Sequence, residues 1–286
     1  MLLYYRNLSK FTIRNYKNDL KNFKNFINLD NNILYKNIDK SLIRKYVHYL
    51  NTQNYERSSI NRKLSVLRSF FNYVSANSDF DEITISMISK SKMQKKLPSI
   101  ISTEQTQRLL SSIDVTNISG VRDRALIETL YTTGMRVSEI SSLNIDDIFD
   151  KNKIKLLGKG AKPRVVFMSD TARIWIDQYI KLCSQKFKNF QNNALFLNKF
   201  GARLSVRSIQ KLVKKYGYKS GIGISLHPHL LRHTFATQML SNGADLRTVQ
   251  TLLGHSKVST TQIYTQVANN DMKKSYFNSH PRVSIK

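Results

Sequence analysis

Apolar side chains recur every three or four residues through the first ninety positions, and this period stops at residues 89–103. Spacing of this kind predicts amphipathic helices, each of which must bury its apolar stripe against another. The stripes are formed by Ile13, Tyr16, Leu20, Phe23 and Phe26, and again by Ile60, Leu64, Leu67, Phe70 and Phe71. We expect a small helical bundle over residues 1–88, with Arg62, Lys63 and Arg68 mostly off its apolar face.

Residues 89–103, SKSKMQKKLPSIIST, are polar and cationic, contain Pro98 and have no sustained period. We interpret them as a linker between two domains, the alternative being a surface loop within one domain. A chain of 286 residues with 41% apolar content is long enough for two cores. The sequence therefore predicts domains at 1–88 and 104–286.

The second domain has a mixed pattern. The stretch GVRDRALIETLYTTG has helical spacing and ends at Gly134. The stretch KIKLLGKGAKPRVVFM alternates on both sides of a Gly-Lys-Gly turn, which predicts a hairpin whose Pro163 favours an edge strand. The expected fold is mainly α, with a small β-sheet or hairpin in the second domain.

The charge balance favours a polyanionic partner. Lys and Arg number 46 against 19 Asp and Glu, for a formal net charge of +27. Nucleic acid is the leading partner and an anionic membrane surface the second. A compositional bias toward Lys and Asn is the alternative explanation, but it does not account for the scarce carboxylates.

The location in the cell is also constrained by composition. Cys183 is the single cysteine, which excludes an internal disulfide framework and a cysteine-based zinc finger and fits a reducing cytoplasm. The start MLLYYRNLSKF is too quickly polar for a signal peptide. No apolar run approaches the roughly 20 residues of a membrane helix. We expect a cytoplasmic protein without a membrane span.

Three of the six histidines lie in the stretch HPHLLRHTFAT. Pro228 suits the first turn of a helix, on which His229 and Arg232 share one face. Leu231, Phe235 and Met239 can bury the opposite side, and Gly243 ends the helix.

A second helix is expected to follow directly. Asp245 can cap it, Gly254 stops it and His255 follows on a turn. Its inner face is predicted to consist of Leu246, Val249, Leu252 and Leu253. Ser259 and Gln262 can then form a capping box, which puts Tyr264 on a short third helix.

These side chains suit covalent phosphoryl transfer without a metal. An arginine fork binds phosphate bidentately, and a histidine moves protons at neutral pH. A tyrosine hydroxyl is a usable nucleophile beside a base and cations. His229 and His233 have the spacing of a zinc pair, but no Glu or Cys completes one, so no metal is expected. We interpret His233 as structural and assign His227 no role.

The segments HLLRHTFATQML, LLGHS and TQIY closely resemble the signature of the tyrosine recombinases. Upstream, TGMRVSE resembles the Thr-Gly-x-Arg-x-Ser-Glu box of that family, and GKGAKPR resembles its lysine-bearing hairpin turn. The resemblance implies six catalytic residues: Arg136, Lys159, His229, Arg232, His255 and Tyr264.

The resemblance covers nearly the whole chain and implies an architecture. Residues 1–88 resemble the SAM-like core-binding domain, 104–286 the catalytic domain, and together they imply a C-shaped clamp on DNA. The ending HPRVSIK resembles Xer-type members. These imply site-specific recombination that resolves chromosome or plasmid dimers, within a tetramer on double-stranded DNA, with a possible second Xer recombinase and a DNA translocase. No cofactor, metal or ATP is implied.

The family chemistry implies a role for each residue. Tyr264 attacks a backbone phosphorus and forms a 3′-phosphotyrosyl link, while Arg136 and Arg232 hold the non-bridging oxygens. By the same resemblance, Lys159 protonates the leaving 5′-oxygen. His229 acts as a base for the tyrosine or orients it, and His255 hydrogen-bonds the phosphate region.

The sequence leaves three alternative functions open and suggests one further contact. A mobile-element integrase shares the motif, a type IB topoisomerase shares the chemistry, and a non-catalytic DNA-binding protein shares the charge. After Tyr264, Met272 and Phe277 are candidate anchors for docking on a neighbouring subunit.

Overall fold

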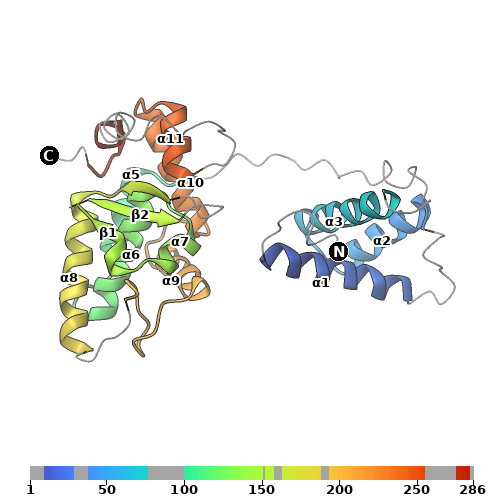
Figure 1. Ribbon diagram of the computed structural model, residues 1–286, viewed down its shortest axis with the longest axis horizontal. Helices are drawn as coiled ribbons and strands as arrows, with labels where there is room; N and C mark the ends of the chain where they lie inside the picture. Colours follow the sequence, from blue (N-terminus) through green and yellow to red (C-terminus); the bar gives the residue numbers. More distant parts are fainter. Residues whose placement is uncertain are drawn as a thin grey trace. The chain divides into compact units, whose positions relative to one another are not determined.

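The computed structural model describes residues 10–28, 38–76, 100–150, 152–157, 163–187, 193–254 and 275–283. The chain divides into two compact units, Met1–Leu97 and Pro98–Lys286 (Figure 1). Most of the predicted linker 89–103 lies outside the described residues. Its last part is described: Ile101 is buried in the core of the second unit, and Ser102 caps the helix that follows. The domain limits drawn from the sequence stay a prediction.

The described part of the first unit is helical, as predicted. It consists of α1 (Lys10–Asn28), α2 (Lys40–Thr52) and α3 (Arg57–Ser75). Apolar side chains from all three helices form one core, in which the Phe23 and Tyr46 rings meet edge to face at 4.9 Å between centroids. Aromatic pairs of this geometry add stability beyond the area that they bury. The core residues include Phe23, Ile27, Leu42, Tyr46, Leu50, Ile60, Leu64, Leu67 and Phe71.

The prediction that Lys63 lies off the apolar face is wrong, because its side chain is only 2% exposed. Its Nζ lies 3.2 Å from Oδ1 of Asp19, a buried carboxylate on α1 that also accepts from Arg62. The aromatic ring of Tyr55 covers the ammonium group at 5.0 Å. A buried charge is tolerated only when it is paired, and Asp19 supplies that partner.

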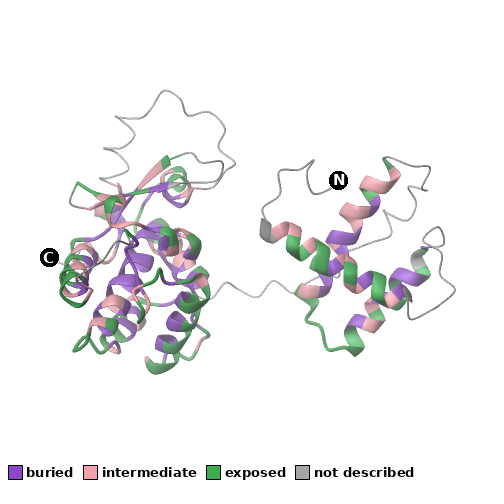
Figure 2. Ribbon diagram, turned by 60° about the horizontal axis from the view of Figure 1, so that its bottom comes forward, coloured by how far each residue is buried: buried purple, intermediate pink, exposed green. Residues whose placement is uncertain are grey.

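The second unit is built around α6 (Ile118–Thr133), which is buried on nearly every side (Figure 2). Helices α5 (Thr103–Ser111), α8 (Asp170–Lys186) and α10 (Pro228–Ser241) pack directly against it. The remaining elements are α7 (Val137–Ser142), the 3-10 turn η2 (Ile145–Asp147), α9 (Val206–Lys219) and α11 (Leu246–Leu253). The central position of α6 means that both of its ends are fixed by tertiary packing.

A three-stranded antiparallel sheet lies beside these helices, in the order β1-β2-β3. Strand β2 (Lys153–Leu157) and strand β3 (Pro163–Phe167) form the predicted hairpin, with Leu157 opposite Pro163 at its closed end. Among the described residues strand β3 is an edge strand, the kind of strand in which a proline such as Pro163 is tolerated. The two-residue strand β1 (Ile148–Phe149) was not predicted, because a segment this short has no readable period.

The predicted helix ends agree with the structure in α6 and α11, and at the start of α10. Gly134 and Gly254 are left-handed C-caps, with φ of 60° and 66°. Pro228 is the first residue of α10, and Asp245 accepts from the Thr248 amide at 2.9 Å.

The predicted inner face of α11 holds for Val249, Leu252 and Leu253 but is wrong for Leu246, which is 56% exposed. Leu246 follows the exposed cap Asp245 directly. Its side chain therefore lies outside the apolar cluster in which Val249, Leu252 and Leu253 are buried.

Residues 275–283 pack on their own unit. Tyr276 and His280 are buried between α6 and α10. The His280 ring is stacked on Tyr276 at 5.4 Å between centroids and tilted against Phe235 at 5.5 Å. Of the two predicted intersubunit anchors, Met272 lies outside the described residues. Phe277 is half-buried against Tyr276 of the same chain, with 5.2 Å between ring centroids. Among the ranges given above, no helix combines the length and apolar character needed to cross a membrane.

Candidate active site

Three of the six predicted catalytic residues are described: Arg136, His229 and Arg232. Lys159, His255 and Tyr264 lie outside the described residues. The site is therefore built from the two arginines and the groups that hold them, and the other three positions stay predictions.

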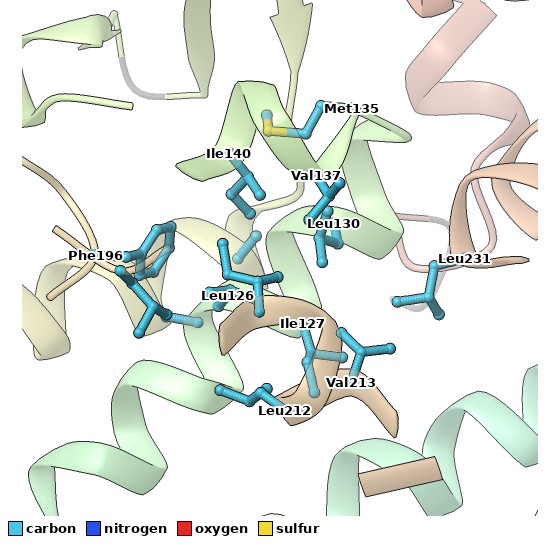
Figure 3. Close-up of a cluster of buried hydrophobic side chains, with 14 of the residues drawn as sticks. Leu126, Ile127, Leu130, Met135, Val137, Ile140, Phe196, Leu212, Val213 and Leu231 are labelled. Atoms are coloured by element: carbon cyan, nitrogen blue, oxygen red, sulfur yellow. The ribbon is translucent and has the colours of Figure 1, made fainter. Parts of the chain in front are cut away.

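Arg136 lies between the end of α6 and the start of α7. Its neighbours Met135 and Val137 are both buried, and Val137 lies beside Leu130 in the core (Figure 3). The backbone at Arg136 is thus anchored on both sides, while its side chain stays 37% exposed.

The polar contacts of Arg136 fix its guanidinium. Its backbone N–H and its Nη1 both donate to Glu139, at 2.7 and 2.9 Å, and its Nη2 donates to the Gly254 carbonyl at 3.1 Å. The salt bridge to Glu139 is the ordinary structural role of an arginine at a helix start. Here it coexists with an exposed edge that is free to face a ligand.

Arg232 is held by two backbone carbonyls at helix ends. Its Nη1 donates to Gly134 O at 2.7 Å, and its Nη2 donates to Leu253 O at 2.7 Å. These carbonyls belong to the C-terminal ends of α6 and α11, where the helix macrodipole favours a cation. The two left-handed glycine caps therefore place the carbonyls that orient both arginines.

Arg164 is a third arginine of this site that was not predicted from sequence. Its Nη1 and Nη2 donate to the two carboxylate oxygens of Glu139, each at 2.9 Å. A signal was present: alternation along β3 puts position 164 on the same face as Val166, which is buried. A cation at an inward-facing strand position needs a buried anion as its partner.

The electrostatics of this arginine cluster, defined as Arg136, Arg164 and Arg232 around Glu139, favour an anion. Burial acts to raise the pKa of the Glu139 carboxyl, but the hydrogen bonds from Arg164 and Arg136 lower it below its ordinary value. Burial, followed by repulsion from Arg136 and Arg164, lowers the pKa of Arg232 to about 10. Three guanidinium groups therefore share one carboxylate, and the excess positive charge suits a phosphate.

The histidines of α10 lie at its N-terminal turn. His229 is exposed in the position after Pro228. His227, which had no predicted role, is the N-cap, and its Nδ1 accepts from the Leu230 amide at 3.1 Å. Partial burial and the neighbouring His229 lower the pKa of His227. His233 is half-buried in the second turn.

The fold and the arginine cluster define a class of protein: two units, mainly helical, with three arginines gathered at the junction of helix ends and a hairpin. The Phage integrase family matches residues 99–271, and the Phage integrase N-terminal SAM-like domain matches residues 1–77. The chain belongs to the phage integrase family.

Similar proteins define the subgroup. A tyrosine recombinase XerD of Staphylococcus epidermidis is 39% identical over 280 residues, which cover 97% of this chain and 95% of the relative. A tyrosine recombinase XerC of Chlamydia caviae is 37% identical over 292 residues, covering 96% and 94%. The crystal structure of XerH site-specific recombinase bound to difH substrate in a pre-cleavage complex superposes with a TM-score of 0.69 at 26% identity, covering 94% of this chain and 80% of that one. The predicted membership of the tyrosine recombinases, Xer type, is confirmed.

Proposed function

We propose that this chain, a site-specific tyrosine recombinase of the Xer type, cuts and rejoins DNA through Tyr264. The Tyr264 oxygen forms a bond to a backbone phosphorus, and the bond from that phosphorus to the 5′-oxygen breaks. The phenol proton goes to a base, and the departing 5′-oxygen takes a proton from Lys159. The product is a 3′-phosphotyrosyl ester and a free 5′-hydroxyl, so neither ATP nor a metal is needed to conserve the ester bond.

The observation that carries this proposal is the arginine cluster. Arg136 and Arg232 are aimed by fixed carbonyls and by Glu139 before any substrate is present. Such pre-oriented donors stabilise the charge that builds on the non-bridging oxygens in the transition state. Removal of one donor of this kind typically costs about 3 kcal/mol of transition-state stabilisation.

The histidines complete the proposed chemistry. His229 is exposed on the same helix as Arg232 and one turn before it, which suits a base or an orienter of Tyr264. His255 follows Gly254, whose carbonyl accepts from Arg136, so the chain enters position 255 from the arginine cluster. We assign it a hydrogen bond to the phosphate.

The charge distribution supports double-stranded DNA as the partner of both units. Residues 1–97 hold 18 Lys and Arg against 7 Asp and Glu, and residues 98–286 hold 28 against 12. In the second unit α9 has five basic residues, no acidic residue and a basic face that is exposed. Helix α9 packs against α7, which begins beside Arg136. The two units are proposed to clamp the duplex, with α9 beside the cleaved phosphate.

Exchange between two duplexes needs four cleavages, and so a homo- or hetero-tetramer on DNA. Relatives of this chain bear both the XerD and the XerC name, which supports a second Xer recombinase as a possible partner. The reaction proposed on this basis is resolution of chromosome or plasmid dimers in the cytoplasm, with a DNA translocase as regulator. Integration of a mobile element would use the same chemistry at a different DNA site.

Trapping the covalent intermediate tests the proposal. Nicked candidate-site DNA, labelled on the 5′ side of the cleavage point so that the label stays on the fragment held by the 3′-phosphotyrosyl link, is incubated with wild type, Tyr264→Phe and Tyr55→Phe. The last variant removes a hydroxyl from a 40% exposed tyrosine in the other unit. Wild type and Tyr55→Phe should give a protease-sensitive adduct, and Tyr264→Phe none. An adduct that persists in Tyr264→Phe would assign the nucleophile elsewhere.

The same proteins separate recombination from its alternatives. A type IB topoisomerase would relax one supercoiled duplex without joining two, and a non-catalytic DNA-binding protein would form no adduct. Strand exchange between two labelled duplexes is the result expected here. Relaxation without exchange would contradict the proposed reaction while leaving the assignment of Tyr264 intact.

A further inference from the structure

One carboxylate connects two separate motifs of this site. Glu139 accepts from Arg136 through one backbone and one side-chain bond, and at the same time accepts both terminal nitrogens of Arg164. The Arg164 side chain is only 13% exposed and Glu139 is 10% exposed. Arg164 is therefore occupied by protein contacts and does not offer its fork to a substrate.

Arg164 also packs against the segment that leads to His255. A Cβ added to Gly254 would lie 2.9 Å from both Cζ and Nη1 of Arg164, so any larger residue would require the guanidinium to shift. The carbonyl of the same glycine accepts from Arg136 at 3.1 Å. The guanidinium of Arg164 thus lies between the start of α7 and the end of α11.

The position of Arg164 in the hairpin gives these contacts a consequence. Leu157 and Pro163 are the last paired positions before the turn, and Arg164 is the next residue of β3. Strand β3 is at the edge of the sheet, with β2 as its partner within the described residues. The two bonds to Glu139 therefore tie the base of the turn that contains Lys159 to the start of α7.

We propose that Arg164 is a positioning residue that fixes the base of the hairpin so that Lys159 reaches the departing 5′-oxygen. This inference rests on the proposed function, in which that oxygen takes its proton from Lys159. An arginine is required because its planar fork holds both carboxylate oxygens, whereas a lysine ammonium would hold one and leave the hairpin free to pivot.

A substrate with sulfur in place of the bridging 5′-oxygen tests the inference. A thiolate leaves without protonation, so a defect confined to proton delivery disappears on this DNA. Cleavage of ordinary and sulfur-substituted site DNA is compared for wild type, Arg164→Ala, Arg164→Lys and Lys159→Ala. The matched control is Arg173→Ala. It removes a salt bridge on the surface of α8, in which Nε of Arg173 lies 2.8 Å from Oδ2 of Asp177.

Arg164→Ala should cleave ordinary DNA about 100-fold more slowly than wild type, the size of loss expected from misplacing a catalytic group by an ångström. It should cleave the sulfur substrate at close to the wild-type rate, as should Lys159→Ala. Arg164→Lys, which keeps the charge, should show a smaller loss with the same rescue. Arg173→Ala should match wild type on both substrates.

If Arg164→Ala loses the same cleavage rate on both substrates, Arg164 acts on the phosphate or on the fold, and the inference is overturned. If it loses no rate on either, Arg164 has no role in cleavage, and the inference is overturned as well. Thermal melting identifies a variant that does not fold, and in that case Arg164→Lys decides. If wild type forms its Tyr264 adduct but Lys159→Ala is not rescued by sulfur, the inference fails and the proposed nucleophile stands. If wild type forms no adduct on either DNA, the proposed function fails and the inference falls with it.

Discussion

At the scale of single residues, the site depends on groups whose roles come from their neighbours. Gly134 and Gly254 are left-handed helix caps, and their carbonyls accept from Arg232 and Arg136 and orient them. The arginines at 136 and 232 could be predicted because they occupy a recognised motif. Lys63 and His227 could not, because their roles depend on a partner far along the chain or on cap geometry. For Arg164 the alternation of β3 signals an inward-facing cation, but its partner Glu139 cannot be identified from sequence.

Gly134→Ala should destabilise the chain by more than Gly243→Ala. Both positions have positive φ, 60° and 88°, so alanine pays about 1–2 kcal/mol of backbone strain at each. At Gly134 the new Cβ would also lie 2.4 Å from the ring of Phe235, whereas at Gly243 nothing lies within 4 Å. Urea unfolding of both variants measures the difference. Equal free energies of unfolding would show that Phe235 moves aside without cost.

Arg232→Lys should slow cleavage by two to three orders of magnitude, roughly the loss of one pre-oriented transition-state donor. A lysine cannot reach Gly134 O and Leu253 O together while facing a phosphate. Single-turnover adduct formation on nicked DNA gives the rate, and a mobility shift gives the affinity, which should change little. Arg247→Lys, at an exposed position of α11, is the control. A loss confined to affinity would contradict the assignment.

At the scale of elements, helix positions and ends were predictable and local exceptions were not. The period of α3, the glycine that ends α6, the proline that begins α10 and the two caps of α11 are local signals, written within a few residues. The exposure of Leu246 and the pairing of β1 depend on where neighbouring elements stop. The packing of residues 275–283 on α6 and α10 was also unpredicted, since Tyr276 and His280 belong to no readable stripe.

The docking of residues 275–283 should weaken in acid. Burial lowers the pKa of His280 to about 3 from an ordinary 6.5, so the undocked ring binds a proton more readily throughout that interval. The stability contributed by the neutral ring is complete above pH 6.5 and is lost as the pH falls toward 3, by about 1.4 kcal/mol for each pH unit.

Fluorescence of Trp175, the one tryptophan of the chain, reports this docking. Its ring lies 5.2 Å from the Arg124 guanidinium, which pairs with Glu128, and Glu128 in turn accepts from Arg282 at 2.5 Å. His280→Gln should flatten the acid dependence of the fluorescence, and His48→Gln, on the exposed side of α2, should leave it unchanged. An unchanged profile in His280→Gln would assign the acid response to another group.

At the scale of the whole molecule, two basic units act on one polyanion. Their helical character and the hairpin followed from periodicity, and membership of the family followed from motifs spread over more than a hundred positions. Charge and periodicity alone reached only a nucleic-acid-binding protein. The reaction became predictable because the spacing of two arginines, a lysine, two histidines and a tyrosine reflects a folded site that no local rule describes.

The salt dependence of DNA binding should identify the face of the second unit that meets the duplex. Arg207 and Lys211 are exposed on the first half of α9, which begins near Ser141 at the end of α7. Lys181 and Lys186 are exposed on α8, whose end lies by Ile118 and Arg122 at the far end of α6 from Arg136. Changing either pair to glutamine removes the same two charges from the full-length chain.

Only the α9 pair should alter the phosphate contacts. Each lost phosphate contact reduces the steepness of the plot of log binding constant against log salt concentration by about 0.9. The double variant Arg207→Gln with Lys211→Gln should therefore have a slope less steep than wild type by close to twice that amount. The double variant Lys181→Gln with Lys186→Gln should keep the wild-type slope, because charges distant from the duplex are screened at moderate salt. Fluorescence anisotropy of labelled duplex over a salt series gives both slopes. Equal slopes in the two variants would mean that binding responds to net charge alone, and the proposed role of α9 would be wrong.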